Sequence, residues 1–279
     1  MKNLCFLLFL IIGIQTVSSQ KHKSVDEDYA YKATYELIFQ MNAADRESQS
    51  SESMLLYFGD KVSRFSSAGK FITDSIIASA RSKNKSWEDL KRIQAQAPVS
   101  EFGYYIYKGI PEGKMSFIQN IMNDDYMYSE NKNKFSWKIL SQTDSIAGFL
   151  TQKATTQFAG RDYVAWFAPE IPFSDGPYKF NGLPGLIVKI ADTENHYVFE
   201  LVELEKLSGS IQYFFEDTNY IKTSKKKLLQ LETNYKKNPL GMLERRGISI
   251  QISDDTRRKL DQQNVEEQKK KNNPLEREL

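Results

Sequence analysis

The chain has 279 residues, and its 38 basic and 36 acidic side chains give a formal net charge of +2. A charge so close to zero gives no electrostatic reason to expect nucleic acid or acidic substrates as partners. The single cysteine, Cys5, lies near the start, so a chain cleaved beyond it lacks disulfides, thiolate nucleophiles and cysteine metal sites.

The first residues are typical of an export signal. Lys2 is followed by an apolar run over residues 4–14 and by small residues at 17–19, which predicts a signal peptide over residues 1–19. The run is too short to span a bilayer, and no later stretch approaches the roughly 18 apolar residues that a transmembrane helix needs. An uncleaved anchor is the alternative. We expect an exported protein with no transmembrane segment after cleavage, located in the periplasm, at the outer membrane or outside the cell.

Short strands interrupted by helices are expected in the first half. Residues 31–41 alternate apolar and polar side chains, which predicts a half-buried strand. Helical spacing of Ile72, Ile76 and Ala80 predicts a helix in an insertion. The other elements that we expect are strands at 54–58, 62–65, 102–108, 115–121, 125–129 and 135–140 and helices at 71–81 and from Ser86. Strands so short and closely spaced favour antiparallel pairing.

The second half begins with a predicted hairpin. Residues 149–158 and 161–167 flank Ala159 and Gly160, which is typical of a glycine turn. The second arm is apolar on both faces, so we expect a central strand covered on both sides. Further strands are expected at 186–191, 197–202, 211–215 and 248–252, and a helix at 223–235. Residues 254–271 carry almost no apolar side chain, which predicts a solvated helix or disordered tail with little to bury.

Prolines and glycines are concentrated in residues 168–185, between two of these strands. Proline fixes φ and glycine permits positive φ, so this composition predicts a loop without repetitive structure. The segment also carries apolar side chains, among them Ile171, Tyr178 and Leu183, which a flexible linker would not carry. We therefore expect an ordered loop that lies back on the core.

Side chains that commonly carry out catalysis are scarce. The only histidines are His22 and His196, and no serine elbow, P-loop, dinucleotide-binding or zinc-protease motif occurs. We expect the Ser-x-x-Lys matches at Ser67 and Ser224 to be chance matches. The acids of the turn at 192–195 would suit a weak calcium site, but a solvated turn explains them better. The sequence therefore predicts no catalytic residue, no metal site and no cofactor.

Aromatic side chains gather in the middle of the chain and allow two interpretations. They line a pocket for an apolar or peptide ligand, or they fill the core of a curved sheet, and the second is favoured. Arg161 is expected either to pair with Glu170 or Asp175 or to be an ordinary strand-end cation. The residues that we assign to a ligand- or partner-binding site are Trp137, Arg161, Trp166, Phe173, Tyr178 and Phe180.

One hexapeptide in the proline-rich segment resembles a known family. It consists of Gly182, Leu183, Pro184, Gly185, Leu186 and Ile187, the sequence after which the GLPGLI (Porph_ging) family is named. Flanking segments that also resemble the family lie at 153–156, 160–161, 165–167, 170–172, 176–180 and 272–276. The resemblance covers most of the chain after the signal. It departs at Leu150, where many members carry cysteine, so no role of that cysteine is carried over.

The resemblance implies an exported protein of a bacterium with two membranes, without an established activity, linked to TonB-dependent outer-membrane receptors. It also implies a structural hexapeptide. Gly182 and Gly185 would free the backbone around Pro184, so that the apolar motif residues enter the core at a sharp corner.

Taken together, the sequence predicts a mainly β, α+β protein. We expect a large curved antiparallel sheet or half-open barrel with two or three covering helices. Residues 20–253 would form one domain, followed by a polar tail at 254–279. The function that we expect is non-enzymatic binding of an apolar small molecule or of an outer-membrane transport protein. The alternative is a carboxylate-dependent hydrolase of envelope or extracellular polymers, which needs two acids about 10 Å apart or closer in a cleft.

Overall fold

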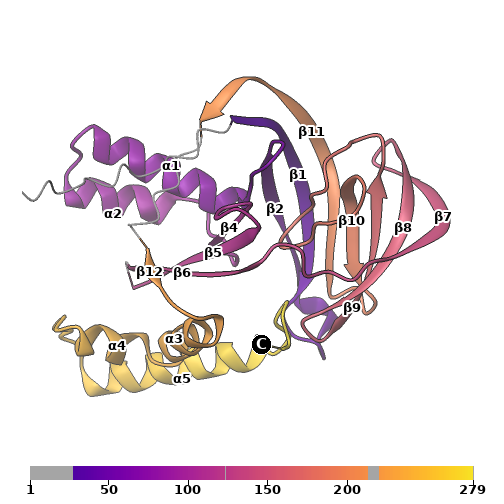
Figure 1. Ribbon diagram of the computed structural model, residues 1–279. Coiled ribbons are helices and arrows are strands. Elements are labelled where there is room, and N and C mark those ends of the chain that lie inside the picture. Colours follow the sequence, from indigo (N-terminus) through magenta and orange to yellow (C-terminus); the bar gives the residue numbers. More distant parts are fainter. Residues whose placement is uncertain (1–27, 123, 213–219, 279) are drawn as a thin grey trace, which may run out of the picture.

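The computed structural model describes residues 28–122, 124–212 and 220–278 (Figure 1). The expected signal peptide at 1–19, His22 and residues 213–215 of an expected strand lie outside these ranges, so they stay predictions. Within the described ranges, no helix is both long and apolar enough to cross a membrane.

A single twelve-stranded sheet dominates the fold (Figure 1). The strand order is β12-β6-β5-β4-β3-β2-β1-β11-β10-β9-β8-β7, so the sheet is not closed and β12 and β7 are its edges. Neighbours pair antiparallel, except that β12 runs parallel to β6. The strands are β1 (Asp28–Gln40), β2 (Gln49–Phe58), β3 (Ser63–Ser67), β4 (Tyr104–Lys108), β5 (Lys114–Ile121), β6 (Asp124–Asn131), β7 (Lys138–Ile146), β8 (Phe149–Phe158), β9 (Arg161–Ala168), β10 (Leu186–Asp192), β11 (Tyr197–Gln212) and β12 (Ile221–Lys222). The expected mainly β fold on a large antiparallel sheet is confirmed.

Helices accompany the sheet on two sides. They are α1 (Ala68–Ser82), α2 (Trp87–Gln96), α3 (Lys225–Lys237), α4 (Pro239–Arg245) and α5 (Asp254–Lys270), with a 3₁₀ turn, η1 (Arg46–Ser48), before β2. α1 packs on β2 and β3, and α3 packs on β5 and β6. In Figure 1, α1 and α2 lie on one side of the β4–β6 strands and α3 to α5 on the other.

Three predicted elements differ from the structure. Residues 211–212, expected to begin a separate strand, are the end of β11, which runs unbroken from Tyr197. Residues 248–252 form no strand, although Ile248, Ile250 and Ile252 alternate. Alternation does not by itself supply a neighbouring strand, and these residues pair with none in the sheet. The aromatic residues Phe135 and Trp137, expected inside a strand, precede β7, which begins at Lys138.

Residues 169–185, which we call the Pro/Gly loop, connect β9 to β10 and lie back on the core as the sequence predicts. Its side chains Ile171, Tyr178, Phe180 and Leu183 are buried. Gly185 closes the loop with φ of +154°, and a Cβ atom there would lie only 2.3 Å from the Ala168 carbonyl oxygen. Only glycine tolerates so close an approach of another backbone segment. The chain then enters β10, whose Leu186 and Ile187 are fully buried.

Alternation along the strands gives the sheet an inner and an outer face. We call inner the face that carries the fully buried Tyr35, Phe167 and Phe199 and is covered by the Pro/Gly loop and α3. On the opposite, outer face, α1 covers β2 and β3, where Phe71 lies 5.7 Å from Tyr57 between ring centroids. The strands β8 to β11 have no such helix among the described residues.

The end of the chain contradicts the expectation of a tail with little to bury. α5 indeed has no buried residue. The residues after it, 272–278, form an extended segment that we call the strap, and in it Asn273 is 2 % exposed and Leu275 8 % exposed. The composition of residues 254–271 said nothing about these later residues. In Figure 1 the strap runs from α5 toward the lower ends of β1 and β9.

Candidate functional site

Three of the six residues assigned from the sequence come together on the inner face. Trp137, Tyr178 and Phe180 belong to one aromatic cluster, in which Phe180 lies 6.4 Å from Trp137 and 6.2 Å from Tyr178 between ring centroids. Trp137 also donates its indole N–H to the Asn181 carbonyl oxygen over 2.8 Å. The rings therefore pack against one another and against the Pro/Gly loop, as core aromatic residues do.

The structure separates the aromatic residues Phe173 and Trp166 from that cluster. Phe173 packs against Tyr31 and Phe58, each with a centroid distance of 5.1 Å. Trp166 points to the outer face, since its neighbours in the strand, Ala165 and Phe167, are fully buried inward. The expectation that β9 is covered on both faces is therefore wrong. Apolar side chains on both sides of β9 reflect one buried face and one half-exposed face.

Arg161 lies at the start of β9 and is buried. Its Nη1 donates to Asp192 Oδ2 over 2.5 Å, and its carbon Cζ lies 4.9 Å from the centre of the Tyr197 ring. It does not pair with Glu170 or Asp175, so both expected pairings are wrong. β10 pairs with β9 in a register that sets Asp192 opposite Tyr163, and this brings the end of β10 to Arg161. The cross-strand register, which residue spacing does not reveal, decides which carboxylate pairs with Arg161.

Asp175 instead holds a second buried cation. Lys108 Nζ, on β4, donates to Asp175 Oδ1 over 2.5 Å and to the Gly176 carbonyl oxygen over 2.6 Å. Burial lowers the pKa of the Lys108 ammonium, and the neighbouring Asp175 carboxylate opposes that shift. The contact fastens the Pro/Gly loop to the far half of the sheet, with both groups withdrawn from water.

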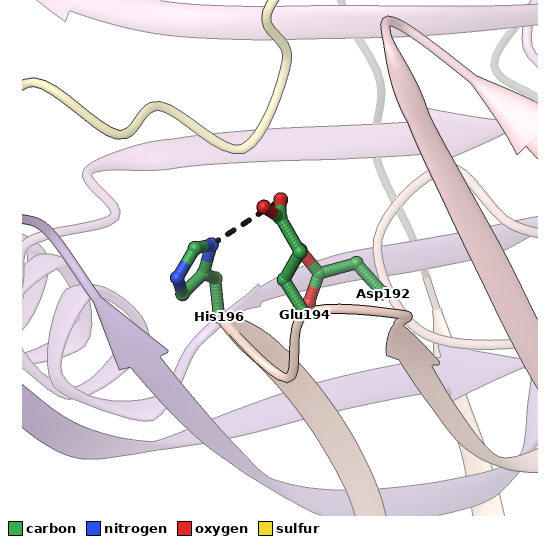
Figure 2. A group of neighbouring side chains, drawn as sticks. All are labelled: Asp192, Glu194 and His196. Atoms are coloured by element: carbon green, nitrogen blue, oxygen red, sulfur yellow. Dashed lines mark ion pairs between the residues drawn. The ribbon is translucent and has the colours of Figure 1, made fainter. Parts of the chain in front are cut away.

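Asp192, Glu194 and His196 form the cluster that most resembles a metal site in the described residues (Figure 2). Their ligand atoms lie within 4.8 Å of one another, and His196 Nδ1 is 3.5 Å from Glu194. Each carboxylate already has an arginine partner, however, because Glu194 pairs with Arg277 over 2.6 Å and Asp192 with Arg161. Guanidinium groups at these positions repel a cation, so the arrangement favours an arginine–carboxylate network.

Both Ser-x-x-Lys matches have a structural explanation. Ser67 Oγ accepts a hydrogen bond from the Lys70 N–H at the start of α1, and Ser224 Oγ accepts one from the Lys227 N–H at the start of α3. A serine that caps the first turn of a helix satisfies a backbone donor that has no partner in the helix. The spacing therefore reflects helix starts.

Glu276 of the strap occupies a cationic niche on the inner face. Its Oε1 accepts hydrogen bonds of 2.5 Å from both Lys179 Nζ and Tyr178 Oη, and its Oε2 lies 2.6 Å from Lys225 Nζ. Burial alone would raise the pKa of this carboxyl, but Lys179 and the hydrogen bonds outweigh it and lower the pKa to about 2. Tyr178 has φ of +52°, which is uncommon for a residue other than glycine. The strap thus holds the Pro/Gly loop at a strained residue.

A hollow lies over β8 and β9, and Tyr163 of the aromatic cluster is part of its lining. Its volume is about 570 Å³, and its lining is rich in hydroxyl and amide groups with a single carboxylate, Asp162. The lining residues are Ser136, Lys138, Thr155, Thr156, Gln157, Asp162, Tyr163, Val164 and Thr193. One carboxylate without a second acid does not make an acid–base pair.

Sequence reasoning missed the buried cations and the strap. Lys108 and Lys179 are fully buried, which nothing in the surrounding pattern signals. For the strap a signal existed, because Pro274 and Leu275 interrupt a polar stretch and belong to a segment that resembles the GLPGLI family.

Comparison with known proteins adds one family match. The family described as "Protein of unknown function (Porph_ging)" matches residues 159–189, which contain β9, the Pro/Gly loop and the start of β10. The resemblance seen in the sequence is thereby confirmed over this segment. No curated protein matches the chain.

Solved structures of PNGF-II, in P21 and C2 space groups, are similar to this chain at 14% sequence identity. Their TM-scores are 0.47 and 0.49, over 73% of this chain. The chain spans about a third of the PNGF-II chains, 33% and 32%. A likeness at this level carries no argument about activity.

Proposed function

We propose that the protein is an exported, non-enzymatic binding protein that contacts a protein partner through the open outer face of β8 to β11. The observation that carries the proposal is the position of Trp166. It is half exposed on that face, whereas the aromatic residues of the inner face are occupied with one another. Tryptophan is among the side chains that contribute most to protein interfaces.

The surroundings of Trp166 suit a partner with acidic and apolar side chains. Lys153 of β8 lies directly opposite, with its Nζ 5.6 Å from the ring centre, and Lys189 of β10 is the neighbour on the other side. Val202 of β11 adds an apolar side chain that is 66% exposed. Lys189 also pairs with Glu200 over 2.7 Å, so the positive charge beside the ring comes mainly from Lys153. An aromatic ring beside a lysine, with an exposed aliphatic group on the same sheet, combines apolar contact with positive charge.

Binding of a small apolar molecule on the inner face has less support. Tyr163 and Phe180 are 1% and 0% exposed, and their ring centroids lie 4.8 Å apart in the centre of the cluster that such a ligand would have to enter. The hollow over β8 and β9 has a lining of mixed character, in which hydroxyl and amide groups lie beside Tyr163 and Val164. An apolar ligand binds where hydrophobic walls surround an open space, and these features are separated in this protein.

A carboxylate-dependent hydrolase also lacks the geometry it needs. Asp175, Asp192 and Glu276 each form an ion pair with a buried lysine or arginine on the inner face. A carboxylate held by a cation is a poor proton donor or acceptor for catalysis near neutral pH. The hollow over β8 and β9 offers Asp162 alone.

The compartment and the class of partner in this proposal come from the sequence. The signal-like residues 1–19 support export to the envelope. The GLPGLI resemblance supports a TonB-dependent outer-membrane transport protein as the partner. We therefore propose a periplasmic or outer-membrane-associated location.

The test is capture of an outer-membrane transport protein from envelope fractions, with the captured protein identified by mass spectrometry. Wild-type protein, Trp166→Ala and Lys189→Glu are compared with Val99→Ala, which alters a residue 94% exposed outside β8 to β11. The proposal expects Trp166→Ala and Lys189→Glu to reduce capture at least about tenfold, as loss of an interface hot spot does. Val99→Ala should keep it. Equal capture by Trp166→Ala and wild type would refute the proposed surface.

A further inference from the structure

The strap is bound as an extended peptide ligand would be. Its main-chain carbonyl oxygens accept hydrogen bonds from side chains of the sheet. Tyr197 Oη donates to the Asn273 carbonyl oxygen over 2.6 Å, and Arg161 Nη2 donates to the Pro274 carbonyl oxygen over 2.6 Å. Arg161 Nε also donates to the Leu275 oxygen over 3.1 Å. Successive carbonyl groups held in this way fix the path of the strap. Its side chains add further contacts, because Asn273 binds Gln40 and Arg161 and Glu276 pairs with Lys179.

Main-chain hydrogen bonds complete the attachment at both ends of the strap. The Asn273 N–H donates to the Met41 oxygen at the end of β1 over 3.0 Å, and the Arg277 N–H donates to the Ala159 oxygen at the turn before β9 over 2.8 Å. Between them, Glu276 fills its niche beside Lys179. We call the residues that receive the strap the cradle. They are Gln40, Met41, Ala159, Arg161, Tyr178, Lys179 and Tyr197.

The helix that carries the strap is attached to its own body only by contacts near the surface, chiefly its packing on α3 and the ion pair between Arg257 and Glu244. α5 has no buried residue, and the connection before it, residues 246–253, has none either. A helix of 17 residues spans about 26 Å, so α5 is an arm long enough to carry the strap away from its own body. The recognition thus resides in the strap and the cradle, whereas the arm serves as a tether.

We propose that the cradle also receives the strap of a second copy of this chain, which gives a dimer that exchanges its C-terminal arms. The second copy is the fitting occupant because its strap offers the identical contacts, including the carboxylate that the Lys179 niche requires. Exchange of an identical element between two chains forms no new contact and breaks none, so it is a low-cost route to a dimer. This inference is independent of the outer face, which the exchange leaves uncovered.

Mass action sets when the exchanged form appears. The tether keeps the chain's own strap at an effective concentration of about millimolar, so the closed monomer dominates in dilute solution. The exchanged dimer forms when chains fold together or are held near that concentration. Once formed, it separates slowly, because every contact of both straps must break at once.

Charge reversal across the strap and cradle provides the test. The full chain with Glu276→Lys carries a strap that Lys179 and Lys225 repel, and the full chain with Lys179→Glu carries a cradle that repels its own Glu276. Neither variant can close on itself, but exchanged arms bring opposite charges together in both cradles of a mixed pair. The chain with both substitutions is the matched control, because it restores the pair within one chain.

We expect each single variant to be a monomer with a lowered melting temperature. Refolded together in equal amounts, they should form a heterodimer, seen by size-exclusion chromatography with light scattering, that melts several degrees above either. The double variant should stay monomeric. A mixture that stays monomeric and melts as two separate components would overturn the proposal.

A second measurement applies if a single variant does not fold. Unlabelled and ¹⁵N-labelled wild-type chains are refolded together at about millimolar concentration, and native mass spectrometry then looks for dimers of mixed isotope content. The proposal expects such dimers, and expects an excess of the peptide of residues 272–278 to suppress them. Absence of mixed dimers, or dimers that the peptide leaves unchanged, would overturn the exchange.

Discussion

The inner and outer faces of the sheet use the same kinds of residue in opposite ways. On the inner face, Arg161, Lys108 and Lys179 are buried and hold carboxylates or backbone oxygens. On the outer face of β8 to β11, Lys153 and Lys189 stay at the surface beside a half-exposed Trp166. Charge thus fastens the loop and the strap on one side, whereas on the other Lys189 forms a surface ion pair with Glu200 and Lys153 lies beside the Trp166 ring.

This contrast shows that the type of a residue does not reveal whether it belongs to the core or to a binding surface. Tyr178, Phe180 and Trp166 were equally good candidates for binding in the sequence, yet the first two are core residues and only the third reaches solvent. Burying a charge is costly unless a partner compensates it. The inner face meets that cost with matched ion pairs, which makes it sensitive to substitution, whereas the outer face should tolerate change.

The largest effect is expected at the corner of the Pro/Gly loop. Gly185→Val places a branched side chain where a Cβ would already lie 2.3 Å from the Ala168 oxygen, so we expect a loss of about 4 kcal/mol or more, or no folded protein. Gly148→Val is the matched control, since Gly148 also has positive φ, +83°, but nothing within 4 Å of its Cβ position. It should cost only about 1–3 kcal/mol. Thermal melting followed by circular dichroism compares them, and equal losses would show that close approach is unimportant.

The second-largest loss of stability is expected for Arg161→Ala. This substitution leaves the buried Asp192 carboxylate without its cation and removes the hydrogen bonds from Arg161 to the strap. We expect the free energy of unfolding, measured in urea, to fall by about 3–5 kcal/mol. Lys259→Ala is the control, because its ion pair with Asp255 lies on the exposed surface of α5. Its unfolding curve should match the wild type. A wild-type curve for Arg161→Ala would contradict the role assigned to the inner cations.

The strap gives the inner face a dependence on pH. The pKa of Glu276 is about 2 in the folded protein, below its ordinary value of 4.5, so its ionised form stabilises the fold. A shift of this size corresponds to roughly 3 kcal/mol, fully present above pH 4.5 and lost as pH falls toward 2. The stability difference between wild type and Glu276→Gln should therefore shrink across that window in chemical denaturation. A difference that stays constant from pH 7 to about pH 2 would exclude this linkage.

The smallest effect on stability is expected on the outer face. Lys153→Ala removes a cation next to Trp166 that stays in contact with water, so we expect a change of at most about 1 kcal/mol. Urea unfolding measures it. A loss as large as that expected for Arg161→Ala would mean that the outer face also supports the fold.

Much of the fold could be predicted because local patterns decide it. The alternation in β1, the glycine turn before β9 and the helical spacing of Ile72, Ile76 and Ala80 in α1 each act within a few residues. The strand expected at 248–252 is absent from the structure. Alternation reports one face that can be buried, and it does not report whether a partner strand is present.

The site was harder to predict, because its contacts join distant residues. Arg161 meets Asp192 and Asn273, which lie 31 and 112 residues away in sequence. The cross-strand register and the path of the strap create these contacts, and residue spacing in the sequence predicts neither. The family resemblance and the glycines together indicated a corner at the Gly182–Ile187 hexapeptide. For the strap the only signal was Pro274 and Leu275 in a polar stretch, which does not reveal where the strap binds.

The most direct test of the division between the faces compares two tryptophans in one experiment. Thermal stability and capture of the proposed partner are measured side by side for Trp137→Ala and Trp166→Ala. Trp137 donates to the Asn181 oxygen under the Pro/Gly loop, so its loss should cost about 2–3 kcal/mol and leave capture unchanged. Trp166→Ala should keep the melting temperature within a few degrees and abolish capture. The reverse pattern, with capture lost in Trp137→Ala and kept in Trp166→Ala, would contradict the account.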